Sequence, residues 1–464
     1  MNTYQPSLNE CPLRYQAIHR PDGVAMMLDQ QPVSFLVLDY WVEQCLHYYQ
    51  SVGIKKNQHI AVITTDSLHT LVIALACLRG EWVFCPINPA FPALQKQQYA
   101  ERIDASLVTH SAEIDFDPDI TVRTKIEPIE INPEYVSHLI ATSGTSGAPK
   151  AVAHCYRSHF VSAIGSAEKL PITISDSWLL SLPLFHVGGF AILVRCLLAG
   201  ATIVCFRNKQ PLHTMLQQVP VTHLSLVNTQ LFRLLEQKID FYQQGVRFIL
   251  LGGGVASPLL VERVQHQGVK LLTTYGMTEM ASQVCTGEPV FTGLGVTSGE
   301  VLPARELRLS NSGEILLRGD TLSPGYYQQG NLISLTDDKG WFHSGDKGQW
   351  HNSQLLVCGR IDNMLISGGE NIHPEEVEQA LLTLPEIVQA VVVSTPHHEF
   401  GCRPVAFVQT VDGLLNEIFI KKRLAGQIAK FKIPDSIWLF PAQAVSAGIK
   451  IDRRFFQQLV KAPV

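Results

Sequence analysis

Hydrophobic and polar residues alternate along the first 300 residues in a way that predicts helices and short buried strands in turn. Apolar positions that recur every three to four residues predict helices over 35–51, 67–79, 155–168 and 189–199. Short apolar runs bounded by turn residues predict strands over 59–65, 82–88, 136–140, 178–184, 201–206, 223–227, 246–254 and 270–276. This alternation predicts an α/β fold with helix-covered parallel sheets, whose sites lie at the carboxyl ends of the strands.

The pattern changes at about residue 295 to short strands and glycine turns, and past Arg360 a further unit begins. In the segment HPEEVEQALLTL, Pro374 predicts a helix start, and apolar residues follow at helical spacing. Two strand-like runs and a helical stretch over 414–430 come next. We therefore expect a large N-terminal domain of helix-covered sheets with a β-rich subdomain, residues 1–361, and a small α+β C-terminal domain, residues 362–464.

The composition is that of a soluble globular enzyme with a sizeable core, since the 464 residues are 46% hydrophobic and 17% charged. The net charge of −5 and the pI near 6.4 argue against a dedicated nucleic-acid binder. The basic cluster Lys421–Arg423 is better explained as the solvated face of a helix. We therefore expect small-molecule partners and no nucleic acid.

The cysteine and histidine patterns exclude several kinds of site. Ten cysteines are scattered without a CxxC motif, which indicates reduced thiols in the cytoplasm, and no histidine spacing matches a zinc-binding helix. The N-terminal segment lacks the charged and apolar regions of a secretory signal. No apolar run reaches the roughly 18 residues of a spanning helix. We expect a cytoplasmic protein without integral membrane contact, and the oligomeric state stays open, a homo-oligomer included.

The segment TSGTSGAPK, residues 142–150, follows a predicted strand and has the composition of a phosphate-binding loop. Its glycines allow the backbone to approach a ligand closely, and its hydroxyls, backbone N–H groups and lysine ammonium suit a phosphate chain. Pro149 stands where a P-loop has the glycine before its lysine, so this is not the usual NTPase motif. A solvated turn is the alternative. The candidate ligands are Thr142, Ser143, Gly144, Thr145, Ser146, Gly147 and Lys150.

Further motifs carry candidate chemistry in chain order. LLGGGVAS places Gly252–Gly254 after a strand, where bare backbone lets a flat ring lie close, although it is not a GxGxxG motif. TTYGMTEMAS supplies Tyr275 for stacking and Glu279 for Mg²⁺ beside phosphates, and HSGD offers Asp346 to ribose hydroxyls. GRIDN and GIKIDRR add an arginine at the domain boundary and a lysine near the C-terminus. Each motif alone is more often structural, but this ordered set favours a nucleotide site.

In this combination the chain resembles, over nearly its whole length, the adenylate-forming superfamily of acyl-CoA synthetases, adenylation domains and luciferases. Within the superfamily it is most similar to the o-succinylbenzoate–CoA ligases of menaquinone biosynthesis. The segments that carry this finer resemblance are WLLSLPLFHVGG (178–189), SLVNTQLFRLL (225–235) and GIKI before the arginines. The resemblance implies an ATP-dependent acid–thiol ligase that uses ATP, Mg²⁺ and coenzyme A, with a mobile C-terminal lid domain.

The resemblance implies a role for each matching position of the nucleotide site. The loop 142–150 would hold the ATP phosphates, Glu279 would bind Mg²⁺, and Asp346 and Arg360 would hold the ribose. The residues implied to flank adenine or to complete the nucleotide site are Gly252, Gly253, Gly254, Val255, Tyr275, Gly276 and Thr278.

The resemblance also implies two half-reactions. A carboxylate attacks the α-phosphorus of ATP to give acyl-AMP and pyrophosphate, and the coenzyme A thiol then attacks the acyl carbon and releases AMP. Lys450 would reach the α-phosphate and the acyl carboxylate, and Thr145 is a further catalytic candidate. Asp362 would be the hinge of the lid, and Gly368 and Gly369 would line the path of coenzyme A.

The acid-binding residues are less closely defined. His186 could face the reacting carboxylate or gate its pocket, and a satisfied buried histidine is the alternative. Arg195, on an apolar helix, could be the counter-charge to a second carboxylate or the partner in a structural ion pair. Ser225, Thr229 and Ser282 are polar substrate contacts on resemblance only.

Three other functions remain open at this point. A general aryl or fatty acyl-CoA synthetase would have a long hydrophobic tunnel without basic residues. A luciferase-like oxygenase would consume oxygen after adenylation. A non-enzymatic acyl-adenylate sensor is disfavoured because it need not keep Lys150, Glu279, Asp346 and Lys450 together. The sequence shows no carrier-protein module, which disfavours a self-contained peptide synthetase.

Overall fold

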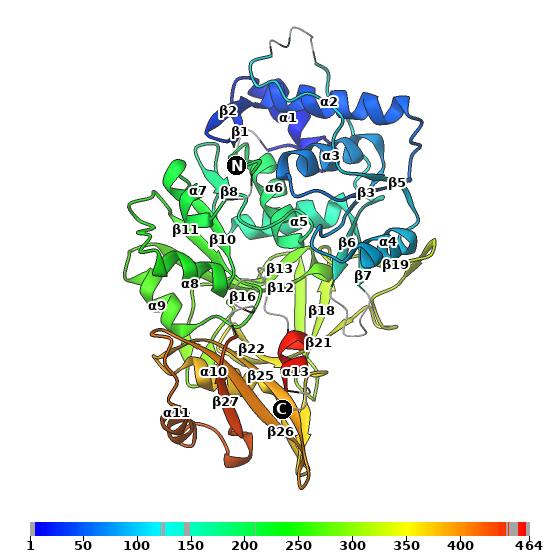
Figure 1. The fold of residues 1–464 in the computed structure, drawn as a ribbon. Helices are drawn as coiled ribbons and strands as arrows, with labels where there is room; N and C mark the ends of the chain where they lie inside the picture. The colour runs from blue at the N-terminus through cyan, green and yellow to red at the C-terminus, as the bar shows by residue number, and fades with distance from the viewer. Residues whose placement is uncertain are drawn as a thin grey trace.

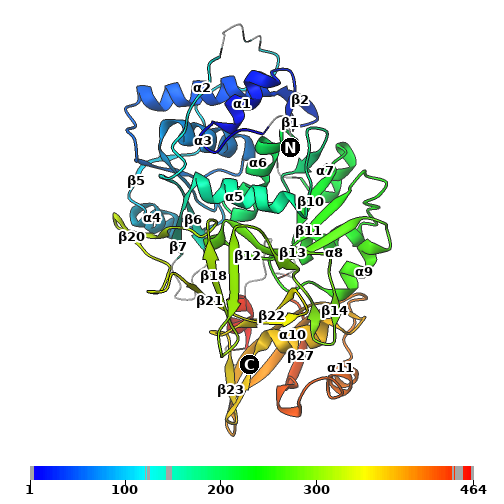
Figure 2. The ribbon, with the colours of Figure 1, turned by 180° about the vertical axis from the view of Figure 1, so that it is seen from behind.

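The computed structural model describes residues 5–120, 122, 126–142, 149–208, 210–441, 444 and 453–460. A large N-terminal domain carries a small C-terminal domain at one end, and Figure 1 shows the small domain below the large one. Two mainly parallel sheets and the helices around them make up most of the large domain (Figures 1 and 2). The α/β fold expected from the alternating sequence pattern is confirmed.

The larger of the two sheets has nine strands, and its middle strands are parallel. The strands that pair antiparallel, β16, β13 and β2, lie toward its two edges. In spatial order the strands are β16 (Glu300–Val301), β13 (Ser282–Gly287), β12 (Lys270–Met277), β11 (Phe248–Leu251), β10 (His223–Leu226), β8 (Ser177–Leu179), β9 (Thr202–Cys205), β1 (Val24–Leu28) and β2 (Gln31–Ser34).

The second sheet has seven strands, four of them parallel to one another. Strands β7, β19 and β20 extend it by antiparallel pairing. In spatial order they are β20 (Asn331–Ile333), β19 (Gly325–Gln328), β7 (Lys150–Cys155), β6 (Val136–Thr142), β4 (Val83–Pro86), β3 (His59–Val62) and β5 (Ala105–Thr109).

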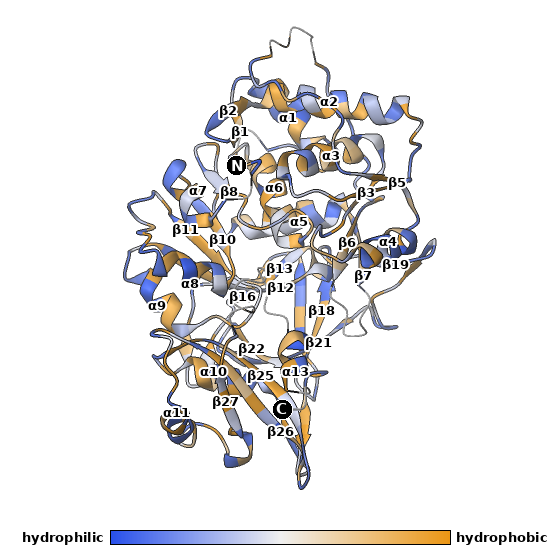
Figure 3. Cartoon of the chain, in the orientation of Figure 1, coloured by the Kyte–Doolittle hydropathy of each residue, from blue (hydrophilic) through white to orange (hydrophobic). Residues whose placement is uncertain are grey.

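Helices cover these sheets, and a continuous apolar cluster joins them to both sheets. Figure 3 shows apolar residues concentrated in helices such as α6 and in central strands such as β11. The helices of the large domain are α1 (Pro12–His19), α2 (Phe35–Ser51), α3 (Ser67–Gly80), α4 (Ala93–Arg102), α5 (Tyr156–Ala167), α6 (Val187–Ala199), α7 (Leu212–Gln218), α8 (Asn228–Glu236), α9 (Pro258–Gln265) and the 3₁₀ turn η1 (Thr278–Met280).

Local sequence explains where several of these helices begin and end. Ser34 accepts a hydrogen bond from the Val37 amide at the start of α2, and Asp66 accepts one from the Leu68 amide at the start of α3. Gly200 ends α6 in the left-handed conformation, with φ +66°.

An antiparallel β-subdomain connects the two domains. Its sheet contains β17 (Arg305–Leu309), β18 (Glu314–Gly319), β21 (Phe342–His351) and β22 (Gln354–Arg360), with β14 (Phe291–Thr292) and β15 (Gly295–Val296) as a separate hairpin. The small domain packs its own core and contains β23 (Leu365–Ser367), β24 (Glu370–Ile372), α10 (Pro374–Leu382), β25 (Ile387–His397), β26 (Gly401–Thr410), α11 (Glu417–Leu424), the 3₁₀ turn η2 (Lys430–Lys432), β27 (Ser436–Leu439) and α13 (Arg453–Leu459).

The small domain docks on the large one through hydrogen bonds and apolar contacts. Gln379 of α10 donates a hydrogen bond of 2.7 Å to the Val357 carbonyl of β22. Gln389 of β25 donates one of 2.8 Å to the Thr229 hydroxyl of α8. Val388 packs with apolar residues of the large domain, so the interface contains a small apolar core as well as polar contacts.

Most of the elements expected from the sequence are present, but several predicted ranges were too long. The strand expected over 59–65 ends at Val62, and the one expected over 246–254 covers only Phe248–Leu251. The strand expected over 178–184 ends at Leu179, because the Ser181 amide bonds the Leu179 carbonyl and Pro183 has no amide hydrogen to donate. The helix expected over 414–430 covers only Glu417–Leu424. Among the described residues, no helix combines the length and the apolar composition that a membrane span requires.

Candidate functional site

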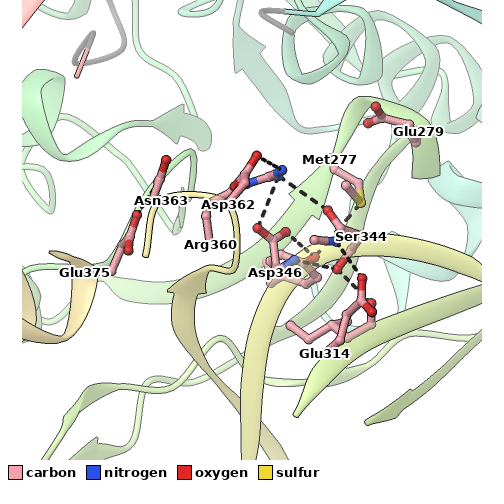
Figure 4. Close-up of polar contacts among 12 residues, drawn as sticks. Met277, Glu279, Glu314, Ser344, Asp346, Arg360, Asp362, Asn363 and Glu375 are labelled. Carbon is pink, nitrogen blue, oxygen red and sulfur yellow. Dashed lines mark hydrogen bonds and ion pairs between the residues drawn. The ribbon is translucent and has the colours of Figure 1, made fainter. Parts of the chain in front are cut away.

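Asp346 lies at the centre of the candidate nucleotide site (Figure 4). It faces Arg360, its partner across the β21–β22 hairpin, with Arg360 Nη1 3.4 Å from Asp346 Oδ1. The Tyr275 hydroxyl from β12 donates a 2.7 Å hydrogen bond to Asp346 Oδ2. The structure therefore brings together three residues that the sequence offered separately for adenine and ribose.

The turn before Asp346 is held rigidly by hydrogen bonds. The Ser344 hydroxyl donates to the Ile315 carbonyl at 2.7 Å and accepts from the Asp346 amide at 3.0 Å. Glu314 accepts from the Gly345 amide at 3.1 Å. Gly345 has φ +71°, and a Cβ there would lie 3.0 Å from an Arg360 nitrogen, so this position requires glycine.

Burial controls the electrostatics of this site. It raises the pKa of Asp346, while the Tyr275 hydrogen bond and the nearby Arg360 act in the opposite direction. Burial, followed by the charge of Asp346, also raises the pKa of Tyr275, so the phenol stays a donor. A carboxylate can accept about four hydrogen bonds, so Asp346 has acceptor capacity for ribose hydroxyls beyond the Tyr275 contact.

Arg360 also binds the candidate hinge residue. Its Nε and Nη2 lie 2.8 and 3.0 Å from the two Asp362 oxygens, and these hydrogen bonds lower the pKa of Asp362. Asn363 donates a 2.5 Å hydrogen bond to Glu375 of α10, and Arg453 of α13 donates one of 3.0 Å to the same oxygen. The segment after Arg360 is thus tied to two helices of the small domain.

Glu279 and Lys150 both contact Tyr326 of β19, a residue that the sequence patterns did not identify. The Tyr326 hydroxyl donates to Glu279 Oε1 at 2.8 Å, and Lys150 Nζ lies 4.7 Å from the centre of the Tyr326 ring. Tyr326 reaches this place because β19 pairs with β7, opposite Val152. The motif GYY was the available signal, but nothing local in it indicates contact with Glu279.

The ends of the predicted phosphate loop are described, and its middle is not. Thr142 and Lys150 are partners across the β6–β7 hairpin, so the loop closes at the carboxyl end of β6. The predicted ligands Ser143, Gly144, Thr145, Ser146 and Gly147 lie outside the described residues. Lys450 does too, and the roles of all six stay predictions.

Glu279 suits a magnesium ion that arrives with a nucleotide. No group of three or more histidine, cysteine or acidic side chains within the described ranges could form a metal cage. Mg²⁺ commonly binds through one or two carboxylates, with phosphate oxygens and waters completing its shell. A single buried acid, oriented by Tyr326, fits that mode of binding.

The glycines after β11 are required partly for close packing. A Cβ on Gly252 would lie 2.7 Å from a Thr274 methyl group, and Gly253 has φ +79°. A Cβ on Gly254 would have no neighbouring atom within 4 Å, so there is open space beside this residue, as a ring-binding position would have. Val255 packs beside the core of the small domain, so it lies at the domain interface.

Gly276 and Thr278, which were also predicted for the nucleotide site, have structural roles. A Cβ on Gly276 would lie 2.1 Å from the Ser282 carbonyl, so glycine lets β12 and β13 approach each other. Thr278 begins the 3₁₀ turn that carries Glu279, and this turn fixes the direction of the acid.

The candidate acid-binding residues fall in different surroundings. His186 is the N-cap residue of α6, and a Cβ on Gly189 would lie 2.2 Å from the Pro183 carbonyl, so glycine lets this turn pack closely. Among the described residues, the buried Ser225 hydroxyl has no hydrogen-bond partner. Thr229 instead binds the small domain through Gln389.

Arg195 is a buried cation without a carboxylate partner among the described residues. Its guanidinium donates to Gln283 Oε1 at 2.5 Å and lies 5.3 Å from the centre of the Trp178 ring, while its Nε has no described partner. Burial lowers the pKa of Arg195 to about 9, and repulsion from Arg305 adds to the effect. The described residues therefore provide no structural ion pair for Arg195. Ser282, next to Gln283, has a positive φ of 99° and begins β13.

The candidate coenzyme A loop lies away from the nucleotide residues. Gly368 and Gly369 form the turn between β23 and β24, and the Gly368 amide bonds the Phe400 carbonyl at 2.9 Å. Figure 2 shows β23 at the outer tip of the small domain. In this arrangement the turn does not meet Asp346.

Comparisons with known proteins agree with this geometry. The model of the AMP-binding enzyme family matches residues 13–327, and that of the AMP-binding enzyme C-terminal domain matches residues 376–444. The 2-succinylbenzoate–CoA ligase of Escherichia coli K12 is 33% identical to this chain, over 98% of this chain and 99% of the relative.

Solved structures match over similar lengths. A variant of E. coli MenE with bound OSB-AMS is 30% identical, with TM-score 0.87, and covers 98% of this chain and 99% of its own. Bacillus subtilis MenE, o-succinylbenzoate CoA synthetase, in complex with the acyl-adenylate intermediate OSB-AMP is 26% identical, with TM-score 0.82 and 98% coverage of both chains. MenE from B. subtilis in complex with ATP and magnesium ion is 26% identical, with TM-score 0.80, and covers 93% of this chain and 96% of its own.

Proposed function

This chain belongs to the AMP-binding enzyme family, and on that basis we propose that it is an ATP-dependent ligase that joins 2-succinylbenzoate to coenzyme A in menaquinone biosynthesis. The reaction forms 2-succinylbenzoyl-AMP and pyrophosphate and then 2-succinylbenzoyl-CoA and AMP. Its small-molecule partners are the acid, ATP with Mg²⁺, and coenzyme A. Relatives that bear this name cover 93–98% of the chain.

The first half-reaction needs positioning and charge more than covalent chemistry by the protein. A carboxylate becomes a good electrophile only after it gains a phosphoanhydride leaving group, so the site must hold the acid against the α-phosphorus and offset the charge that develops there. Asp346 and Tyr275 hold the nucleoside, and Lys150 and Lys450 supply positive charge to the phosphates. Glu279, oriented by Tyr326, holds Mg²⁺, which would neutralise phosphate oxygens.

The second half-reaction uses the small domain in another orientation. One site that serves two reactions favours a movable lid. The proposed domain boundary lies at Asp362, the residue that binds Arg360. When the small domain rotates there, the turn Gly368–Gly369 would swing inward to admit coenzyme A. The outward position of that turn in Figure 2 fits an adenylation arrangement.

The observation that carries the choice of acid is Arg195, a buried guanidinium without a described carboxylate partner. An unpaired buried charge is strongly unfavourable, and a substrate anion would stabilise Arg195, whose Nε has no described partner. 2-Succinylbenzoate has a second carboxylate, and benzoate and palmitate do not. Ser225, with an unpartnered buried hydroxyl, is the proposed polar neighbour.

A pyrophosphate-release assay over a panel of acids tests this proposal. We expect 2-succinylbenzoate to be turned over far faster than benzoate, acetate or palmitate, and coenzyme A to be required for thioester. Faster turnover of benzoate or palmitate would show a general aryl or fatty acyl-CoA synthetase. Oxygen consumption that depends on the acid would show a luciferase-like reaction.

The proposed setting is the cytoplasm, with no nucleic-acid partner. All ten cysteines are free thiols, eight of them buried, as the unpatterned sequence suggested for a reducing compartment. The net charge of −5 opposes binding to a polyanion.

A further inference from the structure

A buried polar cluster joins Arg195 to the edge of the larger sheet. At its centre is Gln283 of β13, whose side chain is almost fully buried. Gln283 Oε1 accepts hydrogen bonds from Arg195 Nη2 at 2.5 Å and from the Ser166 hydroxyl at 2.6 Å. Gln283 Nε2 donates to the Thr286 hydroxyl at 2.6 Å. Both ends of the amide are therefore engaged, and its orientation is defined.

A second arginine lies against the same residue. Arg305 Nε donates to the Gln283 carbonyl at 2.6 Å, and its other nitrogens bind the Pro303 carbonyl and Ser162. All these acceptors are neutral. Arg195 and Arg305 are both buried, and none of the described residues pairs with either as a carboxylate. The cluster thus holds two positive charges and neutral acceptors.

The neutral amide is the informative feature. A carboxylate of the same size at position 283 would bind Arg195 as a charged pair and cancel its charge. An amide oxygen offers the same hydrogen bond without a formal charge. Gln283 therefore fixes the direction of the guanidinium and leaves its charge uncompensated.

We propose that Gln283 is a positioning residue for the acid substrate: it orients Arg195 through a neutral acceptor and so keeps the arginine charge available for the second carboxylate of a dicarboxylic acid. This inference rests on the proposed function, which assigns Arg195 to that carboxylate. Gln283 acts through Arg195 and also sets the preference for acids that carry two negative charges.

The strand register places Gln283 beside the nucleotide site. Gln283 is the partner of Gly276 across β12 and β13, and Gly276 directly follows Tyr275. The Tyr275 hydroxyl donates to Asp346, whereas the Gln283 side chain accepts hydrogen bonds from α5 and α6. One strand pair therefore connects the nucleoside contacts to the acid contacts, so the two substrates are held by a common rigid element.

Substitution of Gln283 by Glu and by Met separates charge from packing. Gln283→Glu keeps size and adds a charge that neutralises Arg195. We expect the KM for 2-succinylbenzoate to rise by about 10- to 100-fold, because a charge-assisted contact is lost. The KM for ATP should stay within about threefold, because the substitution weakens only the binding of the acid, equally in the ground state and the transition state. The preference for 2-succinylbenzoate over benzoate should fall by the same factor as the acid affinity.

Gln283→Met removes the acceptor without adding charge, and we expect a smaller rise of the acid KM in the same direction. Gln16→Glu is the matched control, because Gln16 is equally buried and also contacts α6, at the Leu197 carbonyl. It should lower thermal stability without changing the acid KM. If Gln283→Glu does not fold, as judged by thermal unfolding, the Met variant carries the test.

The outcomes distinguish this inference from the proposed function. If the wild-type protein prefers benzoate or palmitate, the proposed function is wrong whatever the variants do. If the wild type prefers 2-succinylbenzoate but both variants at Gln283 keep its acid KM and its preference, the positioning role is overturned. Equal increases in the KM of acid and ATP would likewise overturn it, since they indicate general damage.

Discussion

Arg360 and Asp346 face each other across the β21–β22 hairpin, with Nη1 3.4 Å from Oδ1, while the same guanidinium binds Asp362. One cation is thus shared by the proposed ribose acid and the proposed hinge acid. Rotation at Asp362 would have to break its contacts with Arg360, which would then be free to turn fully toward Asp346 or a bound nucleotide. We propose that this arrangement links nucleotide binding to the position of the lid.

Replacement of Asp346 by Asn should weaken ATP binding in both half-reactions. The loss of a charged acceptor for ribose hydroxyls is worth roughly 1.5–3 kcal/mol, or about 10- to 100-fold in affinity. The KM for ATP in pyrophosphate release and the affinity for AMP in the reverse thioester reaction measure it. Glu306→Gln, an exposed acid of the same subdomain, is the control and should have no effect. An unchanged ATP affinity would leave HSGD as a structural turn only.

Replacement of Asp362 by Pro should block passage between the half-reactions. Proline fixes φ near −65° and restricts the preceding residue, so the hinge loses its freedom to rotate. We expect acyl-AMP formation to stay within about threefold of wild type and overall thioester formation to fall at least about 100-fold. Asp362→Ala, which removes the Arg360 contact but keeps torsional freedom, is the matched control. Full overall turnover by the proline variant would contradict the hinge assignment.

Replacement of Glu279 by Gln should raise the Mg²⁺ concentration needed for adenylation. A neutral amide binds a hard divalent cation less well than a carboxylate. Tyr326→Phe keeps the acid but loses the hydrogen bond that orients it, and outer contacts of this kind are typically worth about 10- to 100-fold in metal affinity or activity. Titration of pyrophosphate release with Mg²⁺ should therefore show a shift in both variants, larger for Glu279→Gln. Identical Mg²⁺ curves for wild type and Glu279→Gln would exclude this acid as a metal ligand.

Three buried histidines should make the protein less stable in acid. The ring centre of His159 lies 5.0 Å from that of His138 and 4.8 Å from that of His154, where β6, β7 and α5 meet. Burial lowers the pKa of all three, that of His159 to about 3. Histidines in the unfolded chain have pKa values of about 6.5, so below that pH the unfolded chain binds more protons than the folded one. The free energy of unfolding should therefore fall as the pH drops from about 6.5 toward the folded pKa values.

His159→Phe tests this sign. Neither His159 nitrogen has a partner in the described part of the chain, and its ring packs 4.7 Å from Phe190, so phenylalanine fits the surroundings. Thermal unfolding between pH 5 and pH 7.5 should show a shallower loss of stability in the variant, by up to about 1.4 kcal/mol per pH unit. The pH dependence of stability should differ least between the two proteins near pH 7.5, where the histidines are neutral in both the folded and the unfolded chain. Parallel curves would show that His159 does not titrate on unfolding.

Local sequence determined the elements and the chemistry that each could offer. The sequence pattern identified α2, α3, α5 and α6 to within two residues at each end. Buried positions recur at helical spacing in α2, whereas α3 and α6 are buried along nearly their whole length. The family was also recognisable from the sequence, because motifs such as TSGTSGAPK and HSGD keep their order along the chain. Periodicity failed where a short run met Pro183, since a turn competed with the strand.

Only the tertiary structure decided which of these groups work together. Tyr326 orients Glu279 from 47 residues away, and Gln283 orients Arg195 from 88 residues away. Neither contact has a local signal, because the pairing of β7 with β19 and the packing of β13 on α6 are set by burial over the whole domain. A sequence reveals what each side chain could donate or accept. Which partner it meets depends on strand order and packing, which arise from contacts far apart along the chain.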